Sequence, residues 1–208
     1  MPEGYFFSLD GLDGAGKTTQ SRLLADWLRH RGWSVTLCRD PGGTVLGERL
    51  REILLSHRPI TLRGELLLFM ASRAQLVAEV IRPALERGEI VLADRFLLAS
   101  VVYQGHVGGL EPEEVWRLGR WATQNTLPHL TLVLDIPAEV VAQRKPTPAD
   151  EFEQRGLEYL QRVRQAYLQE AARQPDKILV VSAQRSIAEV QTDLQRELQR
   201  VLPAYSRS

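Results

Sequence analysis

The sequence between residues 11 and 18 reads Gly11-Leu12-Asp13-Gly14-Ala15-Gly16-Lys17-Thr18. The spacing Gly-x4-Gly-Lys-Thr is the pattern of a phosphate-binding loop, in which glycines let successive N–H groups point at phosphate oxygens. An apolar run at 5–9 predicts a strand before the loop, and residues 20–31 predict a helix after it. This order argues against the alternative, a glycine-rich turn with a chance lysine. We expect Lys17 to neutralise the β- and γ-phosphates and Thr18 to hold Mg²⁺.

Length and composition limit the class of protein. The chain has 208 residues, of which 44% are apolar and 25% charged, as in an ordinary globular domain. We therefore predict one domain, residues 1–208. A formal net charge of zero gives no indication of a nucleic-acid or membrane partner. Cys38 is the single cysteine and cannot form an internal disulfide, and no apolar run approaches the ~18 residues of a membrane span. We expect a cytoplasmic protein.

Apolar runs alternate with segments of helical periodicity along the chain. Most of these runs are continuous, as in parallel strands that are covered on both faces. The alternation predicts an α/β fold with a parallel sheet of about five strands between helices, a three-layer sandwich. Ligands of such sheets bind beyond the carboxyl ends of the strands. The expected strands are residues 5–9, 34–38, 90–93, 130–134 and 178–181.

Charged residues that could serve a ligand follow the second and third of these strands. Asp94 and Arg95 come directly after the third strand. Beside a phosphate-binding loop, an aspartate there can serve the Mg²⁺ shell and an arginine can bind a phosphate with its two-pronged guanidinium. A plain surface ion pair is the alternative. The stretch Arg39-Asp40-Pro41-Gly42-Gly43-Thr44 after the second strand is either a turn or part of the ligand site, and both interpretations remain open.

A long helix is predicted from residue 65 to residue 87. Its apolar stripe is Leu66, Met70, Ala74, Val77, Ile81 and Ala84. Phe69 and Arg73 are four residues apart and project side by side next to this stripe. An aromatic ring beside a guanidinium can hold a planar base, the ring by stacking and the arginine by hydrogen bonds to a base carbonyl. A core phenylalanine and a solvated arginine are the alternative.

Polar residues follow the Asp94-Arg95 pair at short distance. Ser100, Tyr103 and Gln104 either line a small-molecule pocket or cap and end a short helix. Further on, residues 111–125 predict a helix with Trp116 and Trp121. We expect both tryptophans to be buried, in the core rather than against a subunit partner.

A polar connection at about residues 143–155 follows the fourth strand. It begins with Gln143-Arg144-Lys145, contains two prolines, and leads into a helix with Asp150 as a plausible N-cap. This is where a closing lid lies in a nucleotide-binding sheet. A plain loop is the alternative.

Together these motifs resemble the bacterial-type thymidylate kinases, within the P-loop nucleoside-monophosphate kinases. The resemblance extends from about Tyr5 to Leu202. It rests on the loop from Leu9 to Thr19, on Asp94-Arg95, and on four further motifs: Arg39-Asp40-Pro41-Gly42-Gly43-Thr44, Phe69-Met70-Ala71-Ser72-Arg73-Ala74-Gln75-Leu76, Tyr103-Gln104-Gly105, and Leu134-Asp135 with Arg162-Val163-Arg164-x-x-Tyr167. It implies transfer of the ATP γ-phosphoryl group to deoxythymidine monophosphate (dTMP), with Mg²⁺ as cofactor, in a homodimer.

The resemblance also implies roles for individual residues. Phe69 would stack on thymine, Arg73 would meet a thymine carbonyl, and Tyr103 would crowd the 2′ side of the sugar. Asp13 would lie near the 3′-hydroxyl, and Asp94 would serve Mg²⁺ together with Thr18. The ATP-binding residues it implies are Gly11, Leu12, Asp13, Gly14, Ala15, Gly16, Lys17, Thr18 and Thr19. The implied acceptor-binding residues are Asp13, Arg51, Phe69, Arg73, Arg95, Ser100, Tyr103 and Gln104.

The chain departs from the family pattern in the expected lid. Bacterial members usually carry lid arginines, one of them in an Asp-Arg-x-Glu motif, where this chain has Asp150-Glu151-Phe152-Glu153. The eukaryotic-type alternative, a basic residue within the phosphate-binding loop, is also absent, because Gly14 and Ala15 occupy those positions. The expected catalytic residues are therefore Lys17, Asp94, Arg95 and Arg144, with Lys145 or Arg155 as alternatives to Arg144.

Three other functions compete with this prediction. A kinase of another pyrimidine monophosphate or of a nucleoside is the nearest alternative. A GTPase switch needs an Asn-Lys-x-Asp motif, but the only asparagine, Asn125, is followed by Thr126. A protein that binds nucleotides without turnover would keep the pocket and lack the lid arginine.

Overall fold

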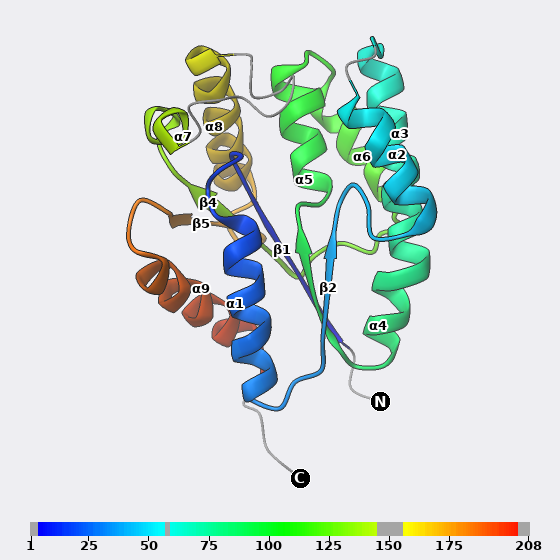
Figure 1. The fold of residues 1–208 in the computed structure, drawn as a ribbon. Helices are drawn as coiled ribbons and strands as arrows, with labels where there is room; N and C mark the ends of the chain where they lie inside the picture. Colours follow the sequence, from blue (N-terminus) through cyan, green and yellow to red (C-terminus); the bar gives the residue numbers. More distant parts are fainter. Residues whose placement is uncertain (1–3, 57–58, 145–155, 204–208) are drawn as a thin grey trace.

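The computed structural model describes residues 4–56, 59–144 and 156–203 and has a parallel sheet as its central layer (Figure 1). The strand order is β2-β3-β1-β4-β5, and every neighbouring pair is parallel. The predicted α/β fold and its strands are confirmed, and each strand ends one or two residues beyond its apolar run. The strands are β1 Tyr5–Gly11, β2 Val35–Arg39, β3 Ile90–Asp94, β4 Leu130–Asp135 and β5 Ile178–Ser182.

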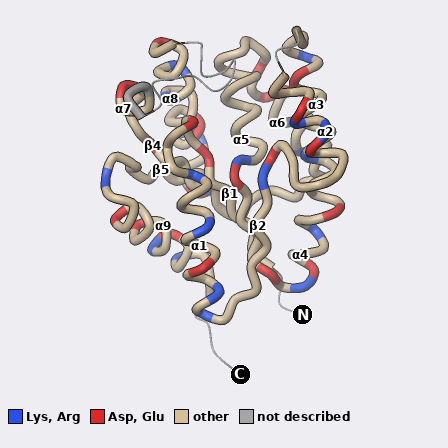
Figure 2. The backbone as a smooth tube through the Cα atoms, viewed as in Figure 1, with Lys and Arg blue, Asp and Glu red and all other residues tan. Residues whose placement is uncertain are grey.

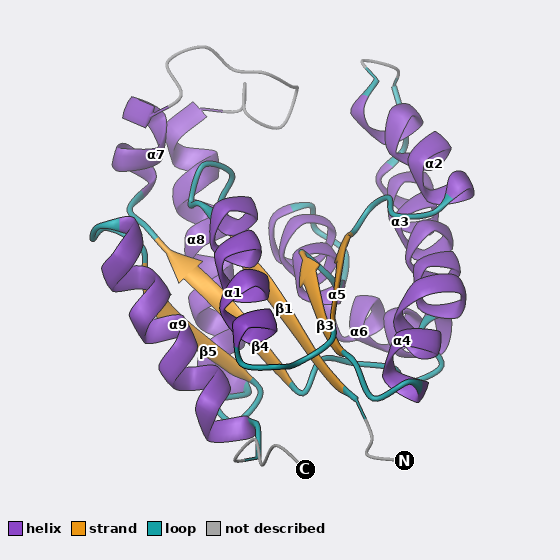
Figure 3. Ribbon diagram, turned by 60° about the horizontal axis from the view of Figure 1, so that its bottom comes forward, coloured by secondary structure: helices purple, strands orange, loops and turns teal. Residues whose placement is uncertain are grey.

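Helices cover both faces of the sheet (Figure 3). Helices α1 and α9 pack together on one face, and α5 and α8 contact the strands from the other. The α-helices are α1 Lys17–His30, α2 Val45–Leu55, α3 Leu62–Leu76, α4 Arg82–Glu86, α5 Leu97–Ser100, α6 Pro112–Ala122, α7 Ala138–Arg144, α8 Gly156–Arg173 and α9 Ile187–Val201. In the part of the chain that the structure describes, two π-helical segments, η1 Val77–Ile81 and η2 Val101–Val107, interrupt them. Within the described residues no helix is long and apolar enough to cross a membrane.

The strand register gathers the polar strand ends at one edge of the sheet. Leu9 in β1 lies opposite Asp94 in β3, which in turn lies opposite Arg39 in β2. The phosphate-binding loop after β1, the turn after β2 and Arg95 after β3 therefore leave the sheet side by side. Figure 2 shows Lys and Arg interspersed with Asp and Glu along the helices. The attraction of this edge for an anion therefore depends on the individual charged residues that lie there.

The predicted helix 65–87 is not one regular helix. It consists of α3, the π-turn η1 and α4, which follow one another directly. Pro83 lies in the first turn of α4 and has no N–H for the hydrogen bond of a regular helix, so η1 changes the bonding pattern just before it. In α3 the buried face includes Ser72 and Arg73, while Ala74 of the predicted stripe is only half-buried.

The tryptophan prediction is wrong for one of the two residues. Trp116 is buried and its Nε1 donates to Glu170 Oε2 at 2.9 Å. Trp121 is 79% exposed, because it lies on the opposite side of α6 from the domain core. Leu23 of α1, which shares a helix face with Leu24, Trp27 and Leu28 by its spacing, is also 38% exposed. Helical spacing alone does not distinguish a core stripe from an apolar surface.

The start of α9 gives a test of the local structure. Ser186 Oγ accepts from the Glu189 backbone N–H at 3.3 Å, and the Ser186 N–H donates to Glu189 Oε2 at 3.0 Å, which is a capping box. Replacing Ser186 by alanine should lower the free energy of unfolding by about 1 kcal/mol, because it leaves the N–H of Glu189 without its cap. Urea unfolding followed by circular dichroism measures this. Thr192→Ala on the same helix removes only a bond to the Ala188 carbonyl and should change stability by less; equal losses would contradict the capping role.

Candidate active site

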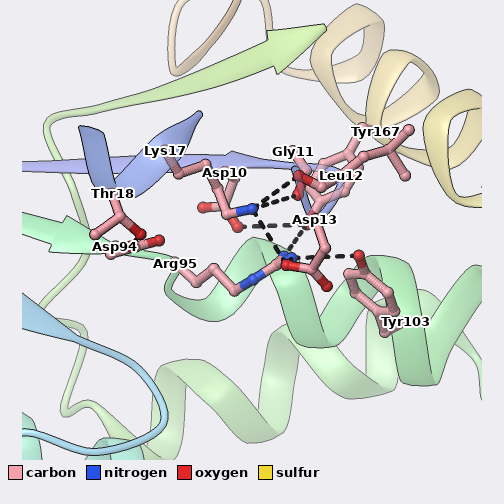
Figure 4. A network of polar contacts seen from close by, with 10 residues as sticks. All are labelled: Asp10, Gly11, Leu12, Asp13, Lys17, Thr18, Asp94, Arg95, Tyr103 and Tyr167. Atoms are coloured by element: carbon pink, nitrogen blue, oxygen red, sulfur yellow. Dashed lines mark hydrogen bonds and ion pairs between the residues drawn. The ribbon is translucent and has the colours of Figure 1, made fainter. Parts of the chain in front are cut away.

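The phosphate-binding loop joins the end of β1 to the start of α1 (Figure 4). Gly11, Gly14 and Gly16 have φ angles of 128°, 82° and 97°, in the left-handed region where other residues are strained. A Cβ on Gly11 would also lie 2.5 Å from the Leu134 carbonyl oxygen in β4. The loop therefore requires glycine at these positions, and the first N–H groups of α1 follow immediately, as an anion site needs.

Lys17 lies inside the loop rather than in solvent. Its Nζ donates to the Leu12 carbonyl at 2.8 Å and to the Gly11 carbonyl at 3.2 Å, and it lies 3.5 Å from Asp13 Oδ1. Burial, followed by the nearby positive charge of Arg95, lowers the pKa of Lys17 to about 8. Phosphate groups next to this ammonium would favour its charged form.

Thr18 and Asp94 form the pair expected to hold a metal ion. Thr18 lies in the first turn of α1 and donates from Oγ1 to Asp94 Oδ2 at 2.5 Å, at the end of β3. A hydroxyl and a carboxylate are hard oxygen donors, and Mg²⁺ commonly takes one or two carboxylates together with substrate phosphates. The described residues contain no group of three or more His, Cys, Asp or Glu that could hold a metal alone. Thr18 and Asp94 could thus supply two of the oxygen ligands of a Mg²⁺ ion, with substrate phosphates as others.

Arg95 lies between the phosphate-binding loop and α8. It has a φ of 68°, which is uncommon for a residue with a side chain and indicates local strain. Its Nη2 donates to Asp13 Oδ1 at 2.8 Å, and its Nη1 donates to the Tyr167 hydroxyl at 3.0 Å. The guanidinium also lies over the Tyr103 ring, 5.2 Å from its centroid. The Arg95 side chain is only 16% exposed, so the neighbouring residues restrict the orientation of its guanidinium.

Two cavities meet at this edge of the sheet. A cavity of about 420 Å³ lies against the loop and is lined by Gly14, Gly16, Lys17, Thr18, Thr19 and Asp94, among others. A cavity of about 130 Å³ lies against α3 and η2. All eight predicted acceptor-binding residues line the smaller one: Asp13, Arg51, Phe69, Arg73, Arg95, Ser100, Tyr103 and Gln104. Both cavities are lined by Asp13, Asp40, Arg51 and Arg95, so they adjoin each other at these residues.

Arg73 is buried at the wall of the smaller cavity, with 1% of its surface exposed. Its Nε donates to Asp40 Oδ2 at 2.5 Å, and its Nη2 donates to Ser100 Oγ at 2.9 Å and to the Phe96 carbonyl at 3.4 Å. Burial raises the pKa of Asp40, and the Arg73 charge opposes that rise. Asp40 therefore pairs with Arg73 from the turn after β2, a partner that the sequence did not indicate.

The other predicted acceptor residues come from separate elements. Phe69 in α3 is half-buried at the cavity. Gln104 in η2 donates to Glu65 Oε1 at 2.7 Å, which ties η2 to α3. Arg51 in α2 donates to the Pro41 carbonyl at 3.0 Å and reaches both cavities. Arg39 in contrast pairs with Glu48 at 2.6 Å and is half exposed at the outer side of the larger cavity.

The three candidate lid cations lie at or beyond the limit of the described residues. Arg144 is the last residue of α7, but its side chain is outside the described part of the chain. Lys145, Arg155 and the rest of the expected lid also lie outside it. Their roles stay predictions.

Asp10 and Tyr167 were not predicted as site residues from the sequence. Asp10 is fully buried in β1, and burial raises its pKa to about 6 although Arg95 and Lys17 act in the opposite direction. The Tyr167 hydroxyl in α8 donates to Asp10 Oδ1 at 3.5 Å and accepts from Arg95. A carboxylate inside an otherwise apolar strand was the available signal for Asp10.

Comparison with known proteins agrees with this geometry. The family model described as Thymidylate kinase matches residues 9–194. The chain is 44% identical to the thymidylate kinase of Symbiobacterium thermophilum over 97% of this chain and 96% of the relative. It is 43% identical to that of Bifidobacterium longum subsp. infantis over 96% of this chain and 88% of the relative. A crystal structure of thymidylate kinase from Ehrlichia chaffeensis is 29% identical and superposes with a TM-score of 0.78 over 95% of this chain and 100% of that one. The chain belongs to the thymidylate kinase family.

Proposed function

We propose that this protein transfers the γ-phosphoryl group of ATP to the 5′-phosphate of dTMP, forming the diphosphate and ADP for DNA precursor synthesis. The observation that carries this proposal is the junction of the two cavities. One cavity has a phosphate-binding loop and the other an aromatic ring beside a buried arginine, and both include Arg95. A donor and an acceptor nucleotide bound in them would bring their phosphates together at this residue, and such positioning supplies much of the catalysis in phosphoryl transfer.

The donor half consists of the loop and the start of α1. The loop N–H groups and Lys17 would hold the β- and γ-phosphates of ATP. Thr18 and Asp94 would hold Mg²⁺, which when bound neutralises charge between the β- and γ-phosphate oxygens. The three glycines with positive φ keep this backbone in shape before ATP arrives.

The acceptor half is built around Phe69 and Arg73. The Phe69 ring can stack on the thymine face. Arg73 uses its Nε and Nη2 hydrogens on Asp40, Ser100 and the Phe96 carbonyl. Its Nη1 meets only the Met70 sulfur at 3.2 Å among the contacts of the described residues, and sulfur is a weak acceptor. Nη1 is thus the group available for a base carbonyl, with its position set by Asp40.

The transfer itself needs little proton chemistry. The acceptor is a phosphate oxygen that is already anionic, so no strong general base is required. The developing charge would be stabilised by Lys17 and Arg95, with Arg144 or a neighbouring lid residue supplying a further cation. The alternative of another pyrimidine monophosphate or a nucleoside as acceptor has no support from the matched family, whose model and relatives are named for thymidylate. The predicted cytoplasmic location stays a prediction.

The homodimer predicted from the family has a suitable surface on α3 and α6. Leu67 and Trp121 are 58% and 79% exposed on these neighbouring helices. A cavity of about 250 Å³ next to Leu67 is also lined by Arg63, Glu114 and Arg117. A two-fold axis brings the same patch of each copy together, so basic and acidic groups on one patch can meet their opposites on the other. We therefore propose a second copy of this chain as the partner of this face.

A panel of acceptors tests the proposed function directly. With ATP and Mg²⁺, kcat/KM should be highest for dTMP, lower for uridine and cytidine monophosphates, and lowest for thymidine. ADP release in a coupled assay measures this. Faster turnover of uridine or cytidine monophosphate would contradict the substrate assignment.

Phe69→Ala locates the base within the site. Loss of a stacked base should raise the KM for dTMP by roughly 5- to 150-fold, the equivalent of about 1–3 kcal/mol. The KM for ATP should stay within about twofold, because Phe69 lines only the smaller cavity. An unchanged KM for dTMP would remove Phe69 from the base site.

Lys17 predicts a pH dependence. Its pKa is lowered from 10.5 to about 8 in the free protein, so the charged form predominates below that pH and is lost above it. The kcat/KM for ATP, which reports groups of the free enzyme, should fall as the pH rises through about 8. In Lys17→Arg any residual activity should lack this descending limb, because arginine stays protonated. A wild-type profile that is flat to high pH would contradict the assignment.

Leu67→Arg tests the dimer. Placing a further cation beside Arg63 and Arg117 on this face should convert a dimer into a monomer in sedimentation-velocity experiments. The matched control is Leu23→Arg, which adds the same charge at an exposed leucine of α1 and should leave the dimer intact. A monomeric wild-type protein, or a dimer in the Leu67 variant, would exclude this interface.

A further inference from the structure

Asp10 is a buried carboxylate without a role in the proposed transfer. It lies at the carboxyl end of β1, has no exposed surface, and its Oδ2 has no hydrogen-bond partner among the described residues. Burial raises the pKa of Asp10, so the folded protein disfavours its charge. A group that the fold tolerates at such a cost commonly serves a site. The question is what Asp10 acts on.

The contacts of Asp10 lead to Arg95 through one hydroxyl group (Figure 4). Arg95 Nη1 donates to the Tyr167 oxygen at 3.0 Å, and the Tyr167 hydroxyl donates to Asp10 Oδ1 at 3.5 Å. A phenol has a single hydrogen. When that hydrogen is directed at Asp10, the lone pairs of the oxygen face Arg95. Asp10 thus sets the direction in which Tyr167 can accept.

The two sides of the Arg95 guanidinium differ in exposure. On one side, Asp13 is 39% exposed and lines both cavities, so a substrate group can replace Arg95 as the hydrogen-bond partner of Asp13. On the other side, Tyr167 and Asp10 are 1% and 0% exposed and line neither cavity. The Tyr167–Asp10 side is therefore the one that can keep its hold on Arg95 when substrates bind.

We propose that Asp10 is a positioning residue that directs the guanidinium of Arg95 at the acceptor phosphate through the hydroxyl group of Tyr167. This inference rests on the proposed function, which places the phosphate of dTMP at Arg95. The alternative is that Asp10 only balances the charge of Lys17. No hydrogen bond or ion pair joins Asp10 to Lys17 among the contacts of the described residues, and Lys17 Nζ is directed at the loop carbonyls and Asp13.

The test compares a ligand that has a phosphate with one that lacks it. Tyr167→Phe removes the hydroxyl and keeps the ring, and Asp10→Asn removes the charge and keeps the shape. Each variant should bind dTMP about fivefold or more weakly in calorimetry at pH 8, because a hydrogen bond of a charged group is lost or weakened. Binding of thymidine should not change. The double variant should lose no more dTMP affinity than the more affected single variant, because both residues belong to one chain of hydrogen bonds.

Three controls separate the positioning role of Asp10 from an effect on folding and from the phosphate site itself. Tyr5→Phe removes a hydroxyl at the opposite end of β1 and should leave both affinities unchanged. Asp10→Asn should not lower the melting temperature at pH 8, because it removes a charge that burial disfavours. Arg95→Met should weaken dTMP binding and spare thymidine, which tests the proposed function alone.

The outcomes distinguish the positioning role from the proposed function. If Arg95→Met weakens dTMP binding but Asp10→Asn and Tyr167→Phe do not, the positioning role is excluded and the phosphate site stands. If thymidine and dTMP weaken equally in the Asp10 and Tyr167 variants, their role is structural and the inference fails. Additive losses in the double variant would show that Asp10 acts by another route, such as Lys17. If Arg95→Met leaves dTMP binding unchanged, the placement of the phosphate itself is wrong.

Discussion

The guanidinium of Arg95 is the group on which the candidate active site depends. It contacts Asp13 in the phosphate-binding loop, Tyr167 in α8 and the Tyr103 ring in η2. The loop follows β1, α8 follows β4, and η2 follows β3, so three separate parts of the chain meet at this group. Its backbone has a φ of 68°, a strain that the surrounding packing must offset. The sheet supplies that support, because Leu9 and Asp94 lie opposite each other and the Arg95 N–H donates to the Leu9 carbonyl at 2.9 Å. The edge of the sheet therefore presents the Arg95 guanidinium to both cavities.

Burial shifts the pKa values of three charged groups in this site. Asp10 and Lys17 both have pKa values shifted by burial toward their neutral forms, and Asp40 is shifted in the same sense. Such shifts cost stability in the free protein, and they decrease when a group of opposite charge arrives. For Lys17 that group would be a triphosphate. For Asp40 the opposite charge is Arg73, already in contact with it at 2.5 Å, whereas Lys17 has Asp13 at 3.5 Å and would gain further negative charge from its ligand.

The sequence predicted the fold well because the strands are continuous apolar runs. The family motifs also indicated eight residues that line the smaller cavity, and their role in acceptor binding stays a prediction. The sequence failed where a role depends on a distant partner. Asp10 accepts a hydrogen bond from Tyr167, 157 residues further along the chain, and Asp40 pairs with Arg73 rather than with solvent. The spacing of Trp121 resembles that of a core residue, and only packing shows that its side of α6 faces outward. Periodicity shows which residues share a face of a helix, but it does not show whether other parts of the protein cover that face.

The central claim is that the Arg95 guanidinium binds the acceptor phosphate at the point where the two cavities meet. A crystal structure with a bisubstrate analogue, in which thymidine and adenosine are joined by a phosphate chain, tests it most directly. We predict that the Arg95 guanidinium contacts the phosphate chain on the thymidine side and keeps its bond to the Tyr167 hydroxyl. A complex with the thymine ring beside Phe69 and the phosphate chain out of hydrogen-bond reach of Arg95 would contradict the account.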